Sequence, residues 1–354
     1  MPTARSANAI RPFVSLIVVN YNGGEKLRRC VNSLVEDSYA ARELIVVDNA
    51  STDGNEAILG ELELRHADLV VIRSAQNLGY AGGVNLGTEI ARGEYVAVLN
   101  MDVVVQTGWL DPLIDFLQEH PEAGAVNPLT AQADGLHINA LGQDLHITGL
   151  GFNHRLGESI RSAGVEPLDV PGIQGAAFVI RRALLEKIGG MDATGFLYHE
   201  DVNLSWLLNL MGSRIYCVPQ SIVRHDYFLS MYPAKLHLLE RNRCAMLLAY
   251  LRRPTLLCLL PLLFVTEALM WAYCLLRGWS FLQAKAASYR WVCRHRRQIA
   301  ERRRLAESLR VLSDWQFLRR LRWAYPLDQL VTLGRERGDS KRQPEGGIPK
   351  AAEY

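Results

Sequence analysis

The sequence predicts an α/β fold in which a mostly parallel sheet is flanked by helices and followed by a helical extension. Residues 13–20, 43–48 and 93–99 are continuous apolar runs, as is typical of strands that are buried on both faces. Helical patterns lie between these runs, and such alternation over residues 13–120 favours a doubly wound sheet with right-handed crossovers. Each run also ends in polar residues, which points to a ligand site at one edge of the sheet.

The individual elements follow from apolar periodicity and from turn residues. The first half is expected to contain strands at 13–20, 43–48, 67–73 and 93–100, with helices at 25–36, from 55, and after the glycine-rich stretch 77–87. The second half is expected to contain a strand at 172–182, helices at 183–188 and 200–211, and a short strand at 214–218.

Residues 124–171 show no clear period and are predicted to form loops or hairpins. Three histidines lie in this stretch, His137, His146 and His154, and their spacing fits no metal site. We therefore expect them to be surface residues that shape an acceptor cleft.

Polar side chains follow three of the predicted strands: Asn20, Asp48, and Asn100 with Asp102. Because the carboxyl ends of parallel strands meet at one edge, these side chains are expected to lie together. A carboxylate placed there can hold a divalent cation against a diphosphate. The alternative is that Asn100 and Asp102 only begin a turn and cap the next helix.

Small residues are predicted to let a ligand approach the backbone at two places. The stretch from Asn77 to Gly87 has glycines where a helix begins, so backbone N–H groups can reach phosphate oxygens. The strand at 172–182 also begins with small residues, including Gly175. The G-x-G-x-x-G fingerprint is missing after the first strand, which argues against a nicotinamide dehydrogenase.

Glu200 and Asp201 open a predicted helix behind the aromatic approach Phe196–His199. Acids in a first turn complement the helix dipole, which would explain one of the two. A pair behind an apolar approach suggests a general base. His225 follows the last strand and is a candidate metal ligand or phosphate contact.

Taken together, these residues resemble the inverting nucleotide-sugar glycosyltransferases of glycosyltransferase family 2, which have the GT-A fold. The branch that the chain resembles most is the rhamnosyltransferase-like one of bacterial surface polysaccharide synthesis. The resemblance extends over about Val14 to Asn242, and it rests on motifs in matching order. These motifs are Val18–Asn22, Val46–Gly54, Asn77–Gly79, Leu99–Asp102, Glu200–Leu204, and His225 with Ser230.

The resemblance implies a role for each candidate residue. Asn20, Tyr21 and Asp48 would line the base pocket, with Asp48 accepting from a pyrimidine N3–H. Asn77 and Gly79 would border the nucleotide, and Asn100 would contact the donor. Asp102 would hold Mg²⁺ or Mn²⁺, and His225 would complete the metal shell. Asp201, beside Glu200, would deprotonate the acceptor hydroxyl as it attacks the anomeric carbon, so the configuration inverts.

The chain departs from the family pattern in three places. Asn100 replaces the first acid of the D-x-D motif, and Met101 stands where Pro is expected. Asn203 replaces an acid that often follows the Glu-Asp pair. The Q-x-x-R-W signature of processive synthases is missing after Asp201, which favours transfer of one sugar over polymerisation.

Charge and cysteine content indicate the partners and the cell compartment of the protein. Lys and Arg gather after Arg241 and are densest at 290–304, a distribution that suits an anionic membrane surface better than nucleic acid. No zinc-finger or RNA-recognition motif is visible, so we expect no nucleic-acid partner. Six scattered cysteines and no cleavable signal peptide indicate a reducing cytosol. Together with the basic run and the apolar stretch before it, this leads us to expect attachment to the cytosolic face of the inner membrane.

The expected organisation has four parts. Residues 1–11 are a disordered leader, 12–232 the catalytic domain, 233–337 a helical region, and 338–354 a disordered tail. Within the helical region, residues 254–276 are almost entirely apolar and long enough to cross a bilayer.

Glu267 near the centre of this apolar stretch disfavours a true span. A helix at the membrane surface is preferred; a span, a soluble helix and an oligomer interface stay open.

The residues together with the resemblance therefore predict a metal-dependent inverting glycosyltransferase that moves one sugar onto a polysaccharide or lipid-linked saccharide. The resemblance alone implies that this sugar is rhamnose from a dTDP donor. The non-enzymatic alternative is a degenerate sugar-nucleotide-binding or scaffold protein at the membrane, motivated by Asn100 and Met101. A nucleotidyltransferase is disfavoured because no Gly-rich, basic loop follows the first strand.

Overall fold

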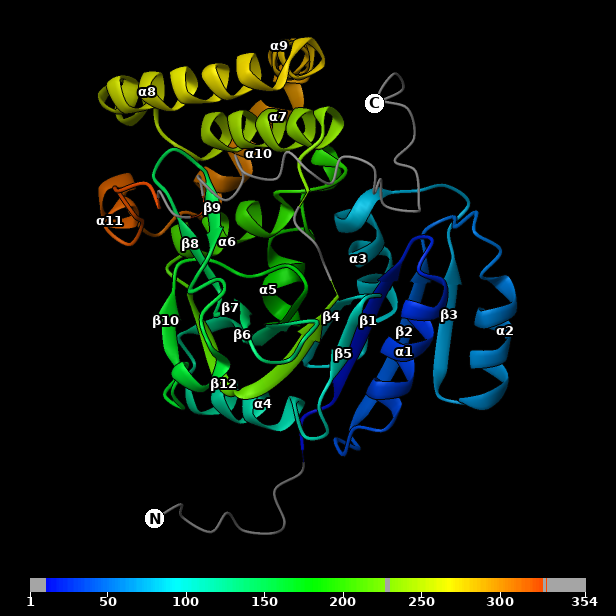
Figure 1. Cartoon of the computed structure of the whole chain (residues 1–354). Coiled ribbons are helices and arrows are strands. Elements are labelled where there is room, and N and C mark those ends of the chain that lie inside the picture. Colours follow the sequence, from blue (N-terminus) through cyan, green and yellow to red (C-terminus); the bar gives the residue numbers. More distant parts are fainter. Residues whose placement is uncertain (1–10, 227–229, 327–328, 330–354) are drawn as a thin grey trace.

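The computed structural model describes residues 11–226, 230–326 and 329. The predicted tail at 338–354, and the predicted leader apart from Arg11, lie outside these residues. Figure 1 shows a central sheet with helices on both faces and a layer of helices, α7 to α10, covering one end of the molecule.

The first half of the chain forms a parallel sheet, as predicted. Its strands are β1 (Val14–Asn20), β2 (Arg42–Asp48), β3 (Leu69–Arg73) and β4 (Tyr95–Asn100), in the spatial order β3-β2-β1-β4. The helices between them are α1 (Gly24–Val35), α2 (Glu56–Arg65) and α3 (Gly79–Ile90). The register sets Asn20 beside Asp48 and Val19 beside Asn100, so three strands end at one level.

The second half extends the sheet with mixed pairing. The antiparallel strand β11 (Ala177–Arg181) lies between β4 and β6 (Ala123–Gln132), and β12 (Arg214–His225) runs parallel to β6. Short strands complete the edges: β5 (Val103–Val105), β7 (Ile138–Ala140), β10 (Leu168–Val170), and the separate pair β8 (Gln143–Leu145) and β9 (Gly151–Asn153). The helices are α4 (Leu110–Glu119), α5 (Arg182–Lys187) and α6 (Glu200–Leu210), with 3₁₀ turns at Ile160–Ser162 and Ala193–Gly195.

The region predicted to be loops contains the central strand β6. Gly124, Asn127 and Pro128 suggest a turn, yet the strand tolerates them because its neighbours compensate. The Asn127 amide donates to the carbonyls of Gln174 and Ala177, and a register shift in the β6–β12 pairing follows Pro128. Strand β12 is also longer than the predicted 214–218, since it continues past this irregularity.

His146 is buried, so its prediction as a surface residue was wrong. Its Nδ1 lies 2.7 Å from the Thr148 hydroxyl, and its ring stacks on Tyr325 at 4.3 Å between centroids. His137 pairs with Asp134 on the surface, as predicted, whereas the half-buried His154 pairs with the buried Asp144.

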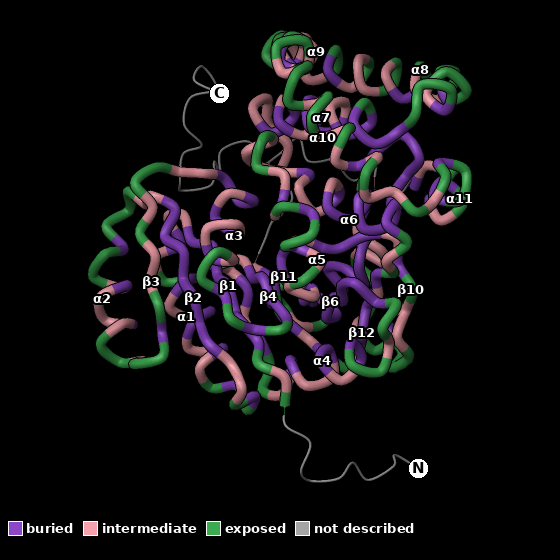
Figure 2. Tube along the Cα trace, turned by 180° about the vertical axis from the view of Figure 1, so that it is seen from behind, coloured by how far each residue is buried: buried purple, intermediate pink, exposed green. Residues whose placement is uncertain are grey.

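Two apolar cores lie on the two faces of the sheet because alternate strand residues point to opposite sides. Ile17 and Val19 pack with α3, α5 and α6, whereas Leu16 and Val18 pack with α1, α2 and α4. Figure 2 shows the sheet strands buried at the centre of the molecule.

The predicted helical region at 233–337 is helical through residue 318. Its helices are α7 (Pro233–Tyr250), α8 (Arg253–Arg277), α9 (Trp279–Arg294), α10 (Arg296–Leu309) and α11 (Asp314–Leu318). α7 packs against α9 and α10, and α8 packs against α9.

Candidate active site

The candidate nucleotide end of the site is built around Asp48, which is 7% exposed at the end of β2. Its Oδ1 accepts from Asn20 Nδ2 at 2.7 Å, Ser51 Oγ at 2.6 Å and Asn55 Nδ2 at 3.2 Å. Its Oδ2 accepts only the Ser51 backbone N–H, at 3.2 Å, among the described residues. Protein donors therefore fix the carboxylate, and Oδ2 keeps a lone pair for a ligand donor.

Two neighbours of Asp48 face the same edge. The Oδ1 atom of Asn20 is buried and has no hydrogen-bond partner in the described part of the chain. Tyr21 is half-buried immediately beyond β1. Asn20, Tyr21 and Asp48 thus lie together, as a base pocket requires.

The loop that starts α3 is held by Asn49, a residue that the sequence analysis did not single out. The Asn49 side chain donates to Asn77 Oδ1 at 3.0 Å and to the Gly79 carbonyl at 2.9 Å, and accepts from the Leu78 N–H at 2.9 Å. Its position directly after Asp48 was the available signal.

Gly79 is required at this loop by both conformation and space. Its φ is +72°, and a Cβ there would lie 1.8 Å from the Phe196 carbonyl oxygen. The Tyr80 N–H donates to that same oxygen at 3.1 Å. The glycine-rich loop is thereby joined to the segment that precedes Glu200.

Asp102 and His225 come together through the pairing of β5 with β12, which places His225 opposite Val103. Asp102 Oδ1 lies 3.3 Å from His225 Nε2, and both side chains are largely buried. Two cis ligand atoms of one octahedral Mg²⁺ are about 3 Å apart, so the pair fits two positions of one cation shell. No group of three or more His, Cys, Asp or Glu side chains suits a metal within the described residues, and a substrate diphosphate would supply other ligands.

Basic side chains of α1 reach the same end of the site. Lys26 Nζ lies 3.4 Å from Asp226 Oδ2 and 3.2 Å from the Asp226 carbonyl oxygen, and Arg29 Nη2 lies 3.5 Å from Oδ2. The Asp226 N–H in turn donates to the Asp102 carbonyl at 3.1 Å. Lys26 and Arg29 therefore bind Asp226, whose backbone is in turn bound to Asp102.

The base candidate Asp201 is oriented by the residues just before β11 and by strand β8. Its Oδ2 accepts from Gln143 Nε2 at 2.8 Å and from the Gly175 N–H at 3.1 Å. Gly175 also permits the close approach, since a Cβ there would lie 3.1 Å from Oδ2. Gln143 lies 58 residues before Asp201 in a region without periodicity, so no sequence signal pointed to it.

Glu200 and Asp201 are electrostatically linked. Burial raises the pKa of both carboxyl groups; the charge of Asp201 raises that of Glu200 further, while hydrogen bonds from Val202, Gly175 and Gln143 partly offset the rise for Asp201. A raised pKa is typical of a carboxylate that takes up a proton during a reaction.

The segment before this pair is strained. Phe196, Tyr198 and His199 have φ of 65°, 65° and 73°, in the left-handed region that costs a bulky residue free energy. Asn242 of α7 holds it in place, because its amide donates to the carbonyls of Gly195, Leu197 and Tyr198 at 3.0, 3.1 and 2.8 Å. The base is thus positioned by a helix of the C-terminal layer.

Tyr80 links the two ends of the site. Its hydroxyl donates to the Gly175 carbonyl at 2.6 Å, next to the N–H that binds Asp201. Burial raises the pKa of Tyr80, and the carboxylates of Glu200, Asp201 and Asp102 raise it further. One side chain therefore lies within electrostatic range of all three acids.

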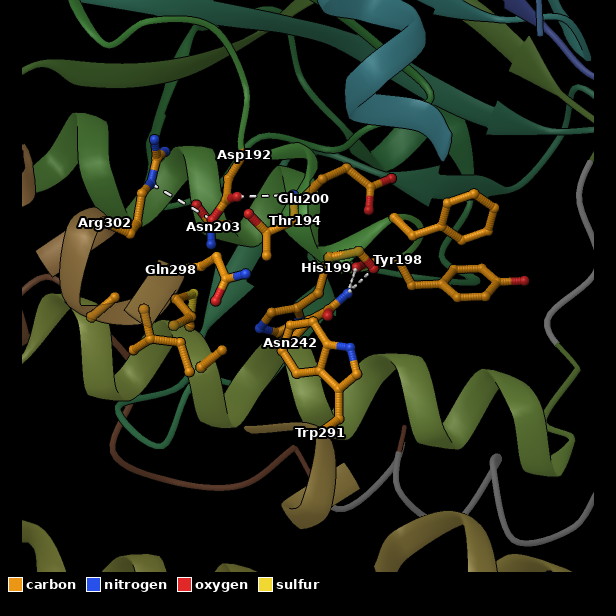
Figure 3. Close-up of a pocket in the computed structure, with 16 residues that line it drawn as sticks. Asp192, Thr194, Tyr198, His199, Glu200, Asn203, Asn242, Trp291, Gln298 and Arg302 are labelled. Atoms are coloured by element: carbon orange, nitrogen blue, oxygen red, sulfur yellow. Dashed lines mark hydrogen bonds and ion pairs between the residues drawn. The ribbon is translucent and has the colours of Figure 1, made fainter. Parts of the chain in front are cut away.

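A cavity of about 30 Å³ lies behind Glu200, between the strained segment and the helices α7, α9 and α10 (Figure 3). His199 Nε2, Glu200 Oε2, Asn242 Oδ1 and Arg302 Nη2 are buried there without a hydrogen-bond partner in the part of the chain that is described. Its size suits ordered water. None of the candidate donor-binding residues at the sheet edge lines this cavity.

Comparison with known proteins places these features in a family. The family model described as "Glycosyl transferase family 2" matches residues 15–189. The N-acetylglucosaminyl-diphospho-decaprenol L-rhamnosyltransferase of Mycobacterium tuberculosis is 30% identical over 233 residues, covering 59% of this chain and 75% of the relative. The pre-mycofactocin glycosyltransferase of the same organism is 29% identical over 60% of this chain and 43% of the relative.

Solved structures share the fold. GalNAc-T7 with UDP, GalNAc and Mn²⁺ is 19% identical and covers 70% of this chain and 49% of its own, with a TM-score of 0.58. The mannosyltransferase PcManGT of Pyrobaculum calidifontis, in complex with GDP-Man and Mn²⁺, is 20% identical and covers 85% and 86%, with a TM-score of 0.51. The chain therefore belongs to glycosyl transferase family 2 and is a glycosyltransferase with the GT-A fold.

Proposed function

We propose that this glycosyltransferase moves a single rhamnose from dTDP-rhamnose to a hydroxyl of a polysaccharide or lipid-linked saccharide, with inversion at the anomeric carbon. The observation that supports this most is the convergence of three strand ends and one helix start. Asn100 of β4 donates its N–H to the Ala176 carbonyl at 2.9 Å, and the adjacent Gly175 N–H binds Asp201. The donor edge and the base are thereby neighbours. The rhamnose donor and the saccharide acceptor come from the similarity to the mycobacterial rhamnosyltransferase.

The donor would lie along the ends of β1, β2 and β4. The free lone pair of Asp48 Oδ2 suits the N3–H of thymine or uracil, and Asn20 and Tyr21 would border the base. Asn77 and Gly79 would contact the ribose side, while Asn100 would donate to a ribose hydroxyl. The diphosphate would then lie between Asp102 and the start of α1.

Asp102 and His225 are the residues that would hold Mg²⁺ or Mn²⁺, which supplies charge neutralisation for the departing nucleoside diphosphate. Lys26 and Arg29 add positive charge at the same place.

Asp201 would accept the proton of the acceptor hydroxyl as that oxygen attacks the anomeric carbon. Attack from the face opposite the nucleotide inverts the configuration. Gln143 and Gly175 hold the Asp201 carboxylate in one orientation, which keeps it aimed at the acceptor. The raised pKa makes Asp201 a stronger base than an ordinary aspartate once it is ionised.

The same proposal places the protein at the cytosolic face of the inner membrane, where a lipid-linked acceptor is exposed. All six cysteines are free thiols, in keeping with a reducing compartment.

The test is a panel of dTDP-, UDP- and GDP-sugars with Mg²⁺ or Mn²⁺, with and without a chelator, following thermal stabilisation and donor hydrolysis. Metal-dependent stabilisation by dTDP-rhamnose above the other donors is expected. Stabilisation without hydrolysis or transfer would favour the degenerate binding protein suggested by Asn100. A folded protein that responds to no nucleotide would overturn the proposal.

A further inference from the structure

Helix α8 turns its apolar side outward. Within residues 254–276, every exposed residue is apolar, and they recur at helical spacing: Pro254, Leu257, Cys258, Leu260, Pro261, Phe264, Val265, Ala268, Leu269, Ala272, Leu275 and Leu276. Phe264 and Leu276 are 75% and 73% exposed. A helix on the surface of a water-soluble domain has the opposite arrangement, so this face fits an apolar environment.

The polar residues in the middle of α8, Thr266 and Glu267, point inward and are bound there. Glu267 Oε1 accepts from Arg243 Nη2 of α7 at 2.5 Å, and Glu267 Oε2 pairs with Lys285 Nζ of α9 at 2.7 Å and accepts from Tyr289. Thr266 is buried and hydrogen-bonds the Tyr325 hydroxyl at 2.7 Å. The charge that disfavoured a membrane location in the sequence is therefore neutralised by the protein.

These contacts fix how α8 can meet a bilayer. α8 is the one helix of the described residues that is long and apolar enough to cross a membrane. To cross, however, it would have to take Glu267 away from Arg243 and Lys285, both almost fully buried, and leave these two cations to share Glu240. If α8 stays on α7 and α9, only its outer side can enter lipid.

The charge around α8 indicates which surface it meets. Arg253, Arg290, Arg294, Arg296, Arg297 and Arg304 are exposed at the starts and ends of α8, α9 and α10, or along α10, and make no ion pair within the described ranges. Trp279, 73% exposed, lies at the junction of α8 and α9. Figure 1 shows α8 and α9 together at the end of the molecule beyond α7. Arginines and a tryptophan beside an apolar face suit an anionic headgroup region.

We propose that α8 lies in the plane of an anionic leaflet, with its outer face in the acyl boundary and Glu267 held on the protein side. This rests on the membrane location in the proposed function, but not on the donor or acceptor assigned there. The protein is then monotopic, and the lipid surface lies against the same helical layer whose Asn242 positions the base segment.

The first experiment is flotation of the full chain with vesicles of phosphatidylcholine and phosphatidylglycerol, mixed at about 7:3. Leu257→Glu with Phe264→Glu should weaken vesicle binding at least about tenfold. The reason is that the insertion of even one such apolar side chain into lipid strengthens binding by about that factor. Leu64→Glu on α2, at a residue 91% exposed and away from α8, is the matched control and should bind like wild type. Pure phosphatidylcholine, or high salt, should also reduce binding.

The second experiment separates an in-plane helix from a spanning one. An environment-sensitive fluorophore is attached to Cys258 near the start of α8, in a chain that carries Cys293→Ser. In a second chain, Leu275→Cys provides the labelled thiol near the end of the helix, and both Cys258 and Cys293 are changed to Ser. Quenching by lipids that carry the quencher at a known depth, confined to the outer leaflet of the vesicles, should report the same shallow depth at both sites. Labels that lie in opposite leaflets, or a label near the centre of the bilayer, would overturn the proposal in favour of a span.

Other outcomes are also decisive. A vesicle-independent dimer that Leu257→Glu with Phe264→Glu dissociates, without lipid binding, would make the face an interface between copies and overturn the proposal. Donor hydrolysis in detergent-free solution, without vesicles, is measured in parallel. Lipid binding without hydrolysis supports this inference while the proposed function fails, and hydrolysis without lipid binding does the reverse.

Discussion

The sheet edge and the C-terminal helical layer both bury polar groups, but the two regions differ in how far those groups are paired. At the sheet edge, Asn20 Oδ1 is buried and accepts no hydrogen bond within the described residues, and Asp102 Oδ1 lies 3.3 Å from His225 Nε2. In the helical layer, Glu240 and Arg243 pair with each other at 2.9 Å and with Lys285 and Glu267 on the neighbouring helices. Open polar groups await a ligand, whereas paired ones hold helices together. Changes at the first should therefore cost activity, and changes at the second should cost stability.

Asp201→Asn is expected to have the largest effect on activity. Removing a general base lowers the rate by about 10²–10⁴-fold, and the amide still fits beside Gly175. Initial rates of transfer give this loss, while calorimetry with the nucleoside diphosphate should show unchanged binding. Retained transfer would show that another group removes the acceptor proton, and lost nucleotide binding would show that the site had been disrupted.

Arg243→Met should instead destabilise the protein by about 3–5 kcal/mol, because it leaves Glu240 and Glu267 buried beside one cation fewer. Arg252→Met is the matched control, since its partner Glu307 is on the surface and the pair contributes at most about 1 kcal/mol. Urea unfolding of both variants measures the difference. Equal losses of unfolding free energy in the two variants would mean that the buried ion pairs of the helical layer stabilise the protein no more than a surface pair does.

Acid should weaken the helical layer. Burial alone would raise the pKa of Glu240, but its pairing with Arg243 and Lys285 outweighs this and lowers the pKa to about 2 from 4.5. The stabilisation is complete above pH 4.5 and is lost as the pH falls towards 2. The melting-temperature difference between wild type and Glu240→Gln should therefore shrink between pH 7 and pH 3. Glu89→Gln, at an exposed residue, is the control and should differ from wild type by a small melting-temperature shift that does not change with pH. A melting-temperature difference that stays constant for Glu240→Gln would contradict the pairing.

Glu200→Gln should have the smallest effect. Burial and the neighbouring Asp201 raise the pKa of Glu200, so near neutral pH its carboxyl is largely protonated and resembles the amide. A loss of less than about tenfold is expected in the rate of transfer. The pH–rate profile is the more telling measurement, since the acid limb belongs to Asp201 and should persist. A loss as large as that of Asp201→Asn would make Glu200 the base.

The parallel half of the fold could be predicted because its strands are buried on both faces and end in polar residues. Asn20, Asp48, Asn100 and Asp102 were all recognisable from this pattern. Strand β6 could not be predicted, because its Gly, Asn and Pro are typical of a turn. Their effect on the strand is compensated only by residues far along the chain.

The same limit applied to the candidate site. Gln143 orients Asp201 across 58 residues, and β5 brings His225 to Asp102 only through pairing with β12. Contacts of this kind leave no local period. The pattern singled out His225 and the Glu200–Asp201 pair but left several roles open for them, and the resemblance to a family supplied one role for each.

The strand order has a consequence for synthesis. β1 to β4 are consecutive in the sequence and adjacent in the sheet, so they can pair as soon as about a hundred residues have left the ribosome. β6 follows them in the chain but cannot join β4, because β11 must first come between the two. The nucleotide edge is thus available early, while the Asp201 side of the site waits for residues beyond 177. A nascent chain stalled between these points would expose the edge of β4, where a chaperone or another strand can attach.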